Sequence, residues 1–356
     1  MKPTYNVLIL GASYGSLFGT KLLLAGHSVT LVCTPPTAEL INREGTLVRF
    51  PIRGRDTLVE IHSSTLTGQL SASAPEGVEP TKFDLVVLGM QESQYSSEGV
   101  REMMARIAAA HLPSLAIMNM PPLPYLARIP GLATDQLQGC FVEPSVWDGF
   151  DPGLVSLASP DPQAFRPPEE PKNVLQVGLP TNFKAAHFES EEHTRILRDL
   201  QADIEASLYD PGDGAIEIPV KLKVHDSIFV PLAKWPMLLA GNYRCIQRDG
   251  MISIREAVHG DIEMAKDAYG WAGKLCTNLG AAETDLVPFE KYARAAEGLA
   301  KPSSAARALF SGAKYIERVD CLIQRIANQQ GLQSDTVDNI VALVDERLGK
   351  NRAVTA

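Results

Sequence analysis

Residues 11–16, Gly-Ala-Ser-Tyr-Gly-Ser, have the composition of a turn that can hold a phosphate group. An apolar run over 7–10 precedes them and is typical of a buried parallel strand, and a helical pattern over 16–25 follows. The N-terminus of such a helix presents backbone N–H groups and the positive end of the helix dipole, which favour a pyrophosphate. Cofactor binding is therefore predicted for Gly11, Ala12, Ser13, Tyr14, Gly15 and Ser16.

This turn departs from the usual dinucleotide pattern G-x-G-x-x-G. Ser13 stands where the second glycine lets the backbone approach the phosphates, and the loop is one residue short. The alternative interpretation is an ordinary strand–turn–helix unit of another α/β protein. A second apolar strand pattern over 29–32 follows the helix, and this placement favours the nucleotide site.

A lysine on an otherwise apolar helix is the second feature that could do chemistry. Lys234 lies in the apolar pattern 229–243, and Asn242 follows at about 80° around an ideal helix, so both can face one cleft. A buried lysine costs several kcal/mol unless it is paired or functional. Desolvation would lower its pKa toward the range useful for proton transfer. The alternative is a lysine whose amine reaches solvent at the end of a buried stem.

The composition narrows the class of ligand. The chain has 356 residues, 45% of them hydrophobic, which is enough for two cores. Its net charge is −9 and its 33 lysines and arginines are scattered, which argues against nucleic acid. No stretch approaches the roughly 20 apolar residues of a membrane span. Residues 1–3 show no signal-peptide pattern, so we expect a cytoplasmic protein that binds a small molecule.

The cysteines are far apart in the sequence and form no C-x-x-C pair. The sequence therefore indicates neither a metal site nor a disulfide framework, and buried reduced thiols are expected. The five residues are Cys33, Cys140, Cys245, Cys276 and Cys321.

Strand and helix patterns alternate in the first half of the chain, which predicts an α/β, Rossmann-type, doubly wound sheet. Expected strands are 7–10, 29–32, 46–50, 57–62, 83–88, 114–118, 138–142, 154–157 and 174–177, and expected helices are 16–25, 38–43 and 97–110. Prolines concentrated in 159–172 indicate an extended loop, which is either a plain connector or a cover for the cleft.

A helical period dominates from about residue 190. Expected helices are 191–208, 227–246, 252–279, 287–299, 303–330 and 335–348, and 216–222 has a strand-like pattern. Two domains follow from this change of period. The sequence predicts a Rossmann-type NAD(P)-binding domain over 1–220, with the proline-rich loop inserted, and an all-α substrate and dimerisation domain over 221–356.

The chain resembles the ketopantoate reductases, within the 6-phosphogluconate dehydrogenase-like superfamily. The N-terminal stretch 15–32 looks like that of the family, and 84–94 falls where the family has a strand that ends in a lysine loop. Met118-Asn119 falls where it has an Asn-Gly pair beside the nicotinamide. The resemblance implies that Met90, Gln91 and Asn119 line the cofactor site.

The same resemblance assigns roles in the helical domain. It implies that Lys234 is the catalytic lysine and that Asn242 binds the substrate two turns further along. Ser303 and Ser304 match its substrate-binding serine, although serines after a proline are usually helix caps. Glu317 matches its acidic residue, on what the pattern predicts to be the long helix 303–330.

Departures from the family pattern leave the substrate open. Leu238 replaces an asparagine of the family, Gln91 replaces the lysine of the loop and Pro121 replaces a glycine. The region 143–184 is bulkier than in the family pattern. The spacing to Glu317 is one residue longer than in the family, so that Arg318 is an alternative occupant of its position. Thr34 occupies the position where the family has an arginine that binds the 2′-phosphate of NADPH. It is also not one of the acidic residues that bind the ribose of NADH.

These observations predict an NAD(P)H-dependent reductase of a small 2-oxo acid, with the substrate between the domains. Lys234 would protonate the carbonyl oxygen, and Glu317 would hold Lys234 in place. Asn119 and Asn242 would orient the carbonyl, and Ser304 would contact the carboxylate. The cofactor is NADP or NAD, with NADPH favoured by the resemblance, and weak discrimination between them is expected from Thr34. A homodimer through the helical domain is also expected.

Two alternatives remain at this point. An opine-type dehydrogenase, which reduces the imine of an amino acid and a 2-oxo acid, would use His225-Asp226 at the domain boundary as its acid–base element. A nucleotide-sensing protein without turnover is the other, because the glycine loop is altered and because Leu238 and Gln91 replace family residues.

Overall fold

The computed structural model describes residues 3–353 and divides the chain into two compact units. Unit 1 comprises Met1–Met90, Gln94–Met118 and Val146–Asp226. Unit 2 comprises Gln91–Ser93, Asn119–Ser145 and Ser227–Ala356. The chain passes from unit 1 to unit 2 for the last time between Asp226 and Ser227, six residues after the expected boundary at 220/221. A single boundary at 220/221 does not describe unit 2, because two of its segments, Gln91–Ser93 and Asn119–Ser145, lie earlier in the chain.

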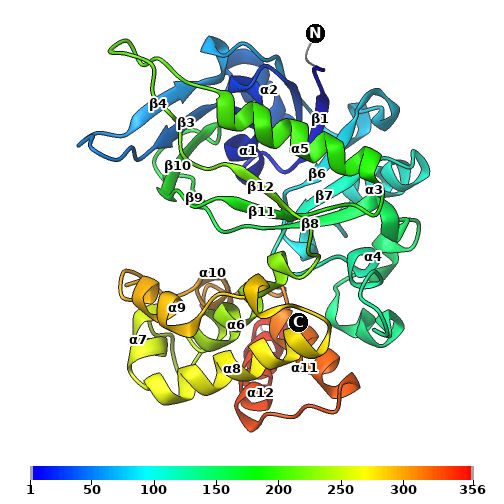
Figure 1. The fold of residues 1–356 in the computed structure, drawn as a ribbon, viewed down its shortest axis with the longest axis vertical. Helices are drawn as coiled ribbons and strands as arrows, with labels where there is room; N and C mark the ends of the chain where they lie inside the picture. Colours follow the sequence, from blue (N-terminus) through cyan, green and yellow to red (C-terminus); the bar gives the residue numbers. More distant parts are fainter. Residues whose placement is uncertain (1–2, 354–356) are drawn as a thin grey trace. The chain divides into compact units, whose positions relative to one another are not determined.

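Unit 1 is built on an eight-stranded sheet with the order β12-β11-β8-β7-β6-β1-β2-β5 (Figure 1). Its strands are β1 (Asn6–Leu10), β2 (Ser28–Val32), β5 (Leu70–Ser73), β6 (Leu85–Leu88), β7 (Ser114–Ile117), β8 (Val155–Ser159), β11 (Phe183–Ala186) and β12 (Leu222–His225). Neighbouring strands are parallel except β8 and β11. The chain runs outward from β1 to β2 and β5 and then returns to β6, so the order reverses beside β1 and the predicted Rossmann-type fold is confirmed.

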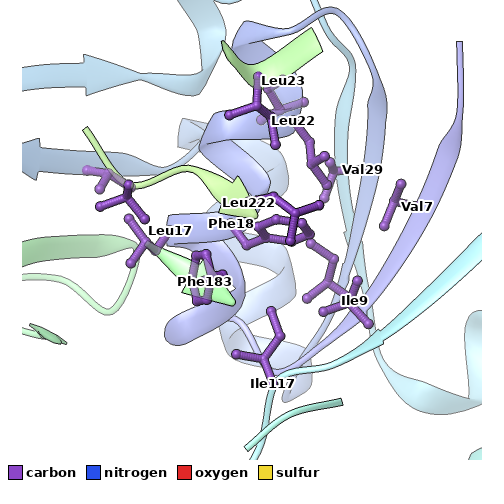
Figure 2. Close-up of a cluster of buried hydrophobic side chains, with 14 of the residues drawn as sticks. Val7, Ile9, Leu17, Phe18, Leu22, Leu23, Val29, Ile117, Phe183 and Leu222 are labelled. Carbon is purple, nitrogen blue, oxygen red and sulfur yellow. The ribbon is translucent and has the colours of Figure 1, made fainter. Parts of the chain in front are cut away.

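Helix α1 (Tyr14–Leu24) is held against the sheet by a buried apolar cluster. It contacts β1 and β2, and α5 (Glu191–Ala206) lies alongside it and contacts β12. Figure 2 shows Phe18 of α1 between Ile9, Val29 and Phe183. The rings of Phe18 and Phe183 meet edge to face, with centroids 5.4 Å apart. This packing fixes the N-terminus of α1 at the carboxyl end of β1.

A second, four-stranded sheet extends unit 1, with the order β4-β3-β10-β9. Its strands are β3 (Leu47–Phe50), β4 (Val59–His62), β9 (Gln163–Phe165) and β10 (Val174–Leu179), and the remaining helices of the unit are α2 (Pro35–Glu44) and α3 (Val100–Ala109). Strand β9 belongs to the proline-rich loop and pairs with β10. The loop is therefore anchored to unit 1 along part of its length.

Unit 2 is mainly helical. Its helices are α4 (Leu123–Leu126), α6 (Lys234–Met237), α7 (Ile254–His259), α8 (Ile262–Asn278), α9 (Phe289–Ala296), α10 (Ser304–Phe310), α11 (Val319–Gln329) and α12 (Asp335–Ala353). A π-helical segment, Leu238–Tyr243, follows α6 and contacts α6, α7, α8, α10 and α11. Over residues 3–353, no helix has the length and apolar character needed to cross a membrane.

Several predicted elements are wrong. The expected strand 138–142 overlaps the 3₁₀-helix Thr134–Cys140, and the expected helix 227–246 contains 3₁₀, α and π turns in succession. The expected helix 252–279 is interrupted because Asp261 caps a new helix, its side chain accepting a hydrogen bond from the N–H of Met264. The expected helix 303–330 ends at Phe310 and restarts at Val319, with Gly312 at a φ of 89° in the break.

Gly15 of α1 offers a direct test of this packing. A Cβ atom there would lie 2.7 Å from Cγ2 of Ile9, so α1 would have to move away from β1. We expect Gly15→Ala to lower the free energy of unfolding by about 1–3 kcal/mol in urea titrations. Gly270→Ala is the matched control, because Gly270 is also helical and a Cβ atom there would meet nothing within 4 Å. Equal stability of the two variants would contradict the close packing of α1.

Candidate functional site

The glycine turn lies at the carboxyl end of β1, next to the end of β6. Gly11 has a φ of 100°, and a Cβ atom there would lie 2.7 Å from Cγ of Met90 and 2.9 Å from the carbonyl oxygen of Gly89. Only glycine fits this position without strain. Within the described chain, the backbone N–H groups of Ala12 and Ser13 have no hydrogen-bond acceptor. They precede the N-terminus of α1, so this turn can bind an anion.

The other residues of the turn stabilise its shape. The N–H of Gly15 donates to the carbonyl of Gly11, and the N–H of Ser16 donates to that of Ser13. The hydroxyl of Ser16 donates to the carbonyl of Ala12. Because a side chain at Gly15 would meet Ile9, this glycine permits close helix–strand packing.

The proline-rich loop contacts this turn. The hydroxyl of Tyr14 donates to the carbonyl of Pro162, and burial raises the pKa of this phenol above its ordinary range. Since β9 of the same loop pairs with β10, the loop is tied down at two points. The loop therefore lies against the glycine turn, and the role of a cover for the cleft stays a prediction beside that of a plain connector.

Sequence reasoning missed Arg166, which this loop brings to the end of β2. Arg166 is partly buried, and its charge acts on the thiol of Cys33, the residue just before Thr34. No carboxylate forms an ion pair with Arg166 in the part of the chain described. Thr34 itself is exposed, and its hydroxyl is 3.0 Å from that of Thr37. Arg166 follows Thr34 by more than a hundred positions in the sequence, so no local pattern indicated that it lies near the end of β2.

Asn119 and Glu317 contact each other within unit 2. Nδ2 of Asn119 donates to Oε2 of Glu317 at 3.3 Å. Glu317 does not lie on a helix, as predicted, but in the break between α10 and α11. Burial raises the pKa of Glu317 to about 7, although the Asn119 amide, the N–H groups of Glu92 and Met120 and the charge of Lys234 all lower it.

Glu92 is a second carboxyl group that sequence reasoning missed. Its side chain is 3% exposed, and Oε1 accepts a hydrogen bond from the N–H of Val142 at 3.0 Å. Oε2 is buried without a hydrogen-bond partner among residues 3–353. Burial raises the pKa of Glu92 to about 7, and the negative charge of Glu317 contributes to this rise. Its position directly after Gln91, in the loop that matches the family pattern, was the available signal.

The remaining predicted residues also lie in unit 2, except for Met90. Lys234 is the first residue of α6 and is half-buried, and its charge acts on Glu317. Asn242 lies in the π-helical segment, whose wider turns do not follow the rotation of an ideal α-helix that the sequence argument used. Gln91 is exposed in unit 2, and Met90 is the last residue of its segment in unit 1, with its N–H donating to the hydroxyl of Tyr95 at 3.1 Å.

The two serines differ in what their hydroxyl groups contact. Ser303 is buried and caps α10, accepting a hydrogen bond from the N–H of Ala306 and donating to the carbonyl of Asn242. Ser304 is exposed. Ser303 therefore joins α10 to the π-helical segment, and Ser304 is the serine whose hydroxyl can reach a ligand.

Arg318 is committed to other partners. Its guanidinium contacts Asp320 at 3.0 Å and Asp345 at 2.6 Å, whereas Glu317 contacts Asn119. The contacts thus favour Glu317 over Arg318 as the residue of the site. Residues 3–353 contain no group of histidine, cysteine and acidic side chains that could hold a metal ion.

Two further buried groups have structural partners. Lys21 of α1 is buried, and its amine donates to the carbonyl of Ile218 at 2.7 Å, while burial lowers its pKa to about 7. The thiols of Cys140 and Cys321 lie 3.3 Å apart, although the cysteines are distant in sequence. Neither contact was apparent from the sequence.

The sequence matches no protein-family model, and a search of curated proteins gave no match. Solved structures do match over nearly the whole chain. The 2-dehydropantoate 2-reductase of Methylococcus capsulatus has a TM-score of 0.67 at 13% identity, covering 97% of this chain and 97% of that chain. The chain has the fold of the ketopantoate reductases.

Other structures with this fold extend the comparison. A complex of D-mandelate dehydrogenase with NADH has a TM-score of 0.58 at 13% identity, covering 97% of this chain and 99% of that chain. A dimeric ketopantoate reductase from Staphylococcus aureus has a TM-score of 0.60 at 12% identity, also over 97% and 99%. The predicted resemblance to ketopantoate reductases is confirmed for the fold.

The raised pKa of Glu317 predicts how stability depends on pH. A carboxyl whose pKa is about 7 in the folded chain and 4.5 ordinarily binds more protons when folded, so the contribution of Glu317 to stability is greatest below pH 4.5 and falls as the pH rises to 7. Glu317→Gln should reduce this slope by up to about 1.4 kcal/mol per pH unit, measured by urea unfolding between pH 4.5 and 8. Glu98→Gln, at an exposed position, is the control. An unchanged slope in Glu317→Gln would contradict the raised pKa.

Proposed function

We propose that the protein is an NAD(P)H-dependent reductase that transfers a hydride to the carbonyl of a small 2-oxo acid. The observation that carries this proposal is the cluster of unit 2, in which Asn119 contacts Glu317 and the charge of Lys234 acts on the same carboxylate. An amide, a carboxyl and an amine are the groups that a carbonyl reduction needs to orient the substrate and supply a proton.

The glycine turn of unit 1 fits a dinucleotide. Gly11 leaves no room for a side chain, and the N–H groups of Ala12 and Ser13 are open to a phosphate. When bound, the cofactor supplies the hydride. The residues proposed for this site remain Gly11, Ala12, Ser13, Tyr14, Gly15, Ser16, Thr34, Met90, Gln91 and Asn119.

The groups of unit 2 handle the proton and the substrate. Lys234 would donate a proton to the oxygen on which negative charge develops, and the carboxylate of Glu317 would stabilise the ammonium form of Lys234. Asn119 and Asn242 would orient the carbonyl, and Ser304 would contact the substrate carboxylate. Ser303 supports this arrangement through its bond to the carbonyl of Asn242.

The opine-type alternative is less well supported. Asp226, which would assist His225, forms an ion pair with Arg198 at 2.6 Å and is exposed. The carboxylate is therefore engaged by an arginine. The activity assay below distinguishes a sensor without turnover from a reductase.

Arg166 supports NADPH as the preferred cofactor. The guanidinium of Arg166 is partly buried, has no carboxylate partner in the described chain and lies near Cys33, the residue before Thr34. In this fold class the 2′-phosphate of NADPH binds just after β2, where this guanidinium can pair with it. Arg43, the other cation nearby in sequence, pairs with Glu44 at 2.7 Å. Weak discrimination between NADPH and NADH, expected from Thr34 alone, stays the alternative.

We also propose that the protein acts in the cytoplasm as a homodimer assembled through the helical unit. The support for the dimer is that a ketopantoate reductase of the same fold is dimeric. No nucleic acid or membrane partner is proposed.

The activity test uses a panel of 2-oxo acids, with and without amines, and follows the oxidation of NADPH and NADH. We expect turnover of a 2-oxo acid without an amine, and Lys234→Ala should lower kcat by on the order of 10² to 10⁴ with nearly unchanged cofactor affinity. Asn242→Ala should act mainly on KM. The basic limb of the pH profile should disappear in Lys234→Ala.

The same assay can contradict the proposal. Turnover only in the presence of an amine, with Lys234→Ala within threefold of the unmodified protein and His225→Ala inactive, would establish the opine-type reaction. Cofactor binding without turnover of any panel member would establish a sensor.

A binding experiment tests the role of Arg166. Loss of one charge-assisted interaction with the 2′-phosphate costs about 1.5–3 kcal/mol, so Arg166→Leu should weaken NADPH binding by about 10- to 100-fold. NADH binding should stay within threefold. Arg43→Leu is the matched control, because Arg43 already has a carboxylate partner. Equal losses for NADPH and NADH in a folded Arg166→Leu would contradict the assignment, as would a loss for NADPH in Arg43→Leu.

A further inference from the structure

Two cysteines that are far apart in the sequence meet inside unit 2. Cys140 is the last residue of the 3₁₀-helix Thr134–Cys140, and Cys321 lies in the first turn of α11. The thiol of Cys140 donates a hydrogen bond to the sulfur of Cys321, with the two Sγ atoms 3.3 Å apart. Both residues are buried, with exposed fractions of 4% and 9%. The sulfurs of a disulfide lie about 2.0 Å apart, so only a small movement separates this pair from a covalent bond.

The two elements that carry the cysteines are held together by other contacts. Nε2 of Gln329, on α11, donates to the carbonyl of Ala133 at 2.9 Å, and its Oε1 accepts from the N–H of Ala133 at 3.0 Å. Nη1 of Arg325 donates to the carbonyl of Gln136 at 3.3 Å. A Cβ atom at Gly139 would lie 2.7 Å from the same Nη1, so this guanidinium lies beside the residue that precedes Cys140. The two thiols therefore face each other in an interface that these side chains hold in register.

The surroundings make Cys321 the more reactive of the two thiols. The hydrogen bond from Cys140 lowers the pKa of Cys321 and raises the pKa of Cys140. The charges of Arg318 and Arg325 also lower the pKa of Cys321, whereas burial and the charge of Asp320 raise it. Because the thiolate is the form of cysteine that attacks an oxidant, Cys321 is expected to react first.

We propose that Cys140 and Cys321 form a site of reversible oxidation, at which a hydroperoxide closes a disulfide and a dithiol reopens it. Cys321 is the attacking thiolate, and Cys140 is the resolving thiol. This site is independent of the function proposed above, because it uses neither the cofactor nor the substrate.

The atoms and electrons of the closure balance. The thiolate of Cys321 attacks one oxygen of hydrogen peroxide, the O–O bond breaks, and Cys321 becomes a sulfenic acid while hydroxide leaves and takes up a proton. The sulfur of Cys140 then attacks the sulfur of Cys321, the S–O bond breaks, and the proton of Cys140 leaves with the oxygen as water. The two sulfurs lose two electrons, and the peroxide gains them and becomes two molecules of water. On reopening, the dithiol returns two electrons and itself becomes a disulfide.

The disulfide joins the two segments that carry the candidate site. Cys321 follows Glu317 closely in sequence, and Cys140 belongs to the same inner segment of unit 2 as Asn119. The cross-link therefore fastens the chain beside the contact between Asn119 and Glu317. The two cysteines are 181 positions apart, and a disulfide that closes so long a loop restricts the unfolded chain strongly. The oxidised chain is thus expected to be the more stable form.

Thiol mapping of the full chain tests the proposal. The protein is treated with hydrogen peroxide at neutral pH and unfolded, its free thiols are alkylated, and the digest is analysed by mass spectrometry. We expect a cross-linked peptide pair that contains Cys140 and Cys321, with a loss of two hydrogen atoms, whereas Cys33, Cys245 and Cys276 stay free to be alkylated. Dithiothreitol should restore all five thiols.

Single variants separate the two roles. In Cys140→Ala, Cys321 should stop at the sulfenic acid, which dimedone traps. In Cys321→Ala, dimedone labelling of Cys140 should be lower by about tenfold, because the thiol with the raised pKa remains. Cys276→Ala is the matched control, since its thiol is also buried and lies against the carbonyl of Leu232. This control should form the disulfide as the unmodified protein does.

Thermal unfolding tests the effect on stability. Peroxide treatment should raise the unfolding midpoint of the unmodified protein and of Cys276→Ala by about 5 °C. The same treatment should not raise the midpoint of Cys140→Ala.

The proposal is overturned if Cys140 and Cys321 are both alkylated after peroxide treatment, or if either one pairs with a different cysteine. Equal dimedone labelling of Cys140 and Cys321 in the two variants would overturn the assigned order of attack. Because the mapping uses the unmodified chain, its result stands even where a variant does not fold. A protein that reduces no 2-oxo acid would disprove the reductase function, and the mapping would still decide whether this disulfide forms.

Discussion

The parallel pairing of β6 and β7 is the constraint on which the candidate site depends. Their register places Leu88 opposite Ala116, so both strands end at the same edge of the sheet. The segment after β6 carries Glu92, and the segment after β7 carries Asn119. Because parallel neighbours must end together, the polar residues that follow them start close together. The amide of Asn119 and the backbone N–H of Glu92 both lower the pKa of Glu317. Carboxyl ends of parallel strands are where open α/β sheets bind ligands.

The break between α10 and α11 completes this arrangement. A continuous helix over 303–330 would have placed Glu317 on a helix face, whereas the irregular segment with Gly312 lets its carboxylate meet Asn119 and the N–H of Met120. The burial of Glu317 and Glu92 opposes folding at neutral pH. Destabilising groups of this kind are common where a protein needs a proton donor or acceptor near pH 7.

The proline-rich loop has a comparable effect in unit 1. Strand β9 anchors it, Tyr14 contacts it at Pro162, and Arg166 then lies near Cys33 at the end of β2. The loop therefore connects the glycine turn with the end of β2, where we propose that cofactor preference is decided. A cation that the local sequence after β2 lacks is supplied from a distant segment.

Local patterns in the sequence were sufficient for the glycine turn, the parallel core strands and the change to a helical second half. Apolar runs such as Val7–Leu10 are determined by burial on both faces of the sheet, and Gly11 by a backbone conformation that other residues rarely adopt. Sequence also indicated Asn119, Glu317 and Lys234, which the structure places in one unit. Tertiary structure alone decided that 91–93 and 119–145 belong to unit 2, that the helices break at Asp261 and near Gly312, that Glu92 is buried and that Arg166 lies near Cys33. These features depend on contacts between residues far apart in the chain, and no local propensity encodes such contacts.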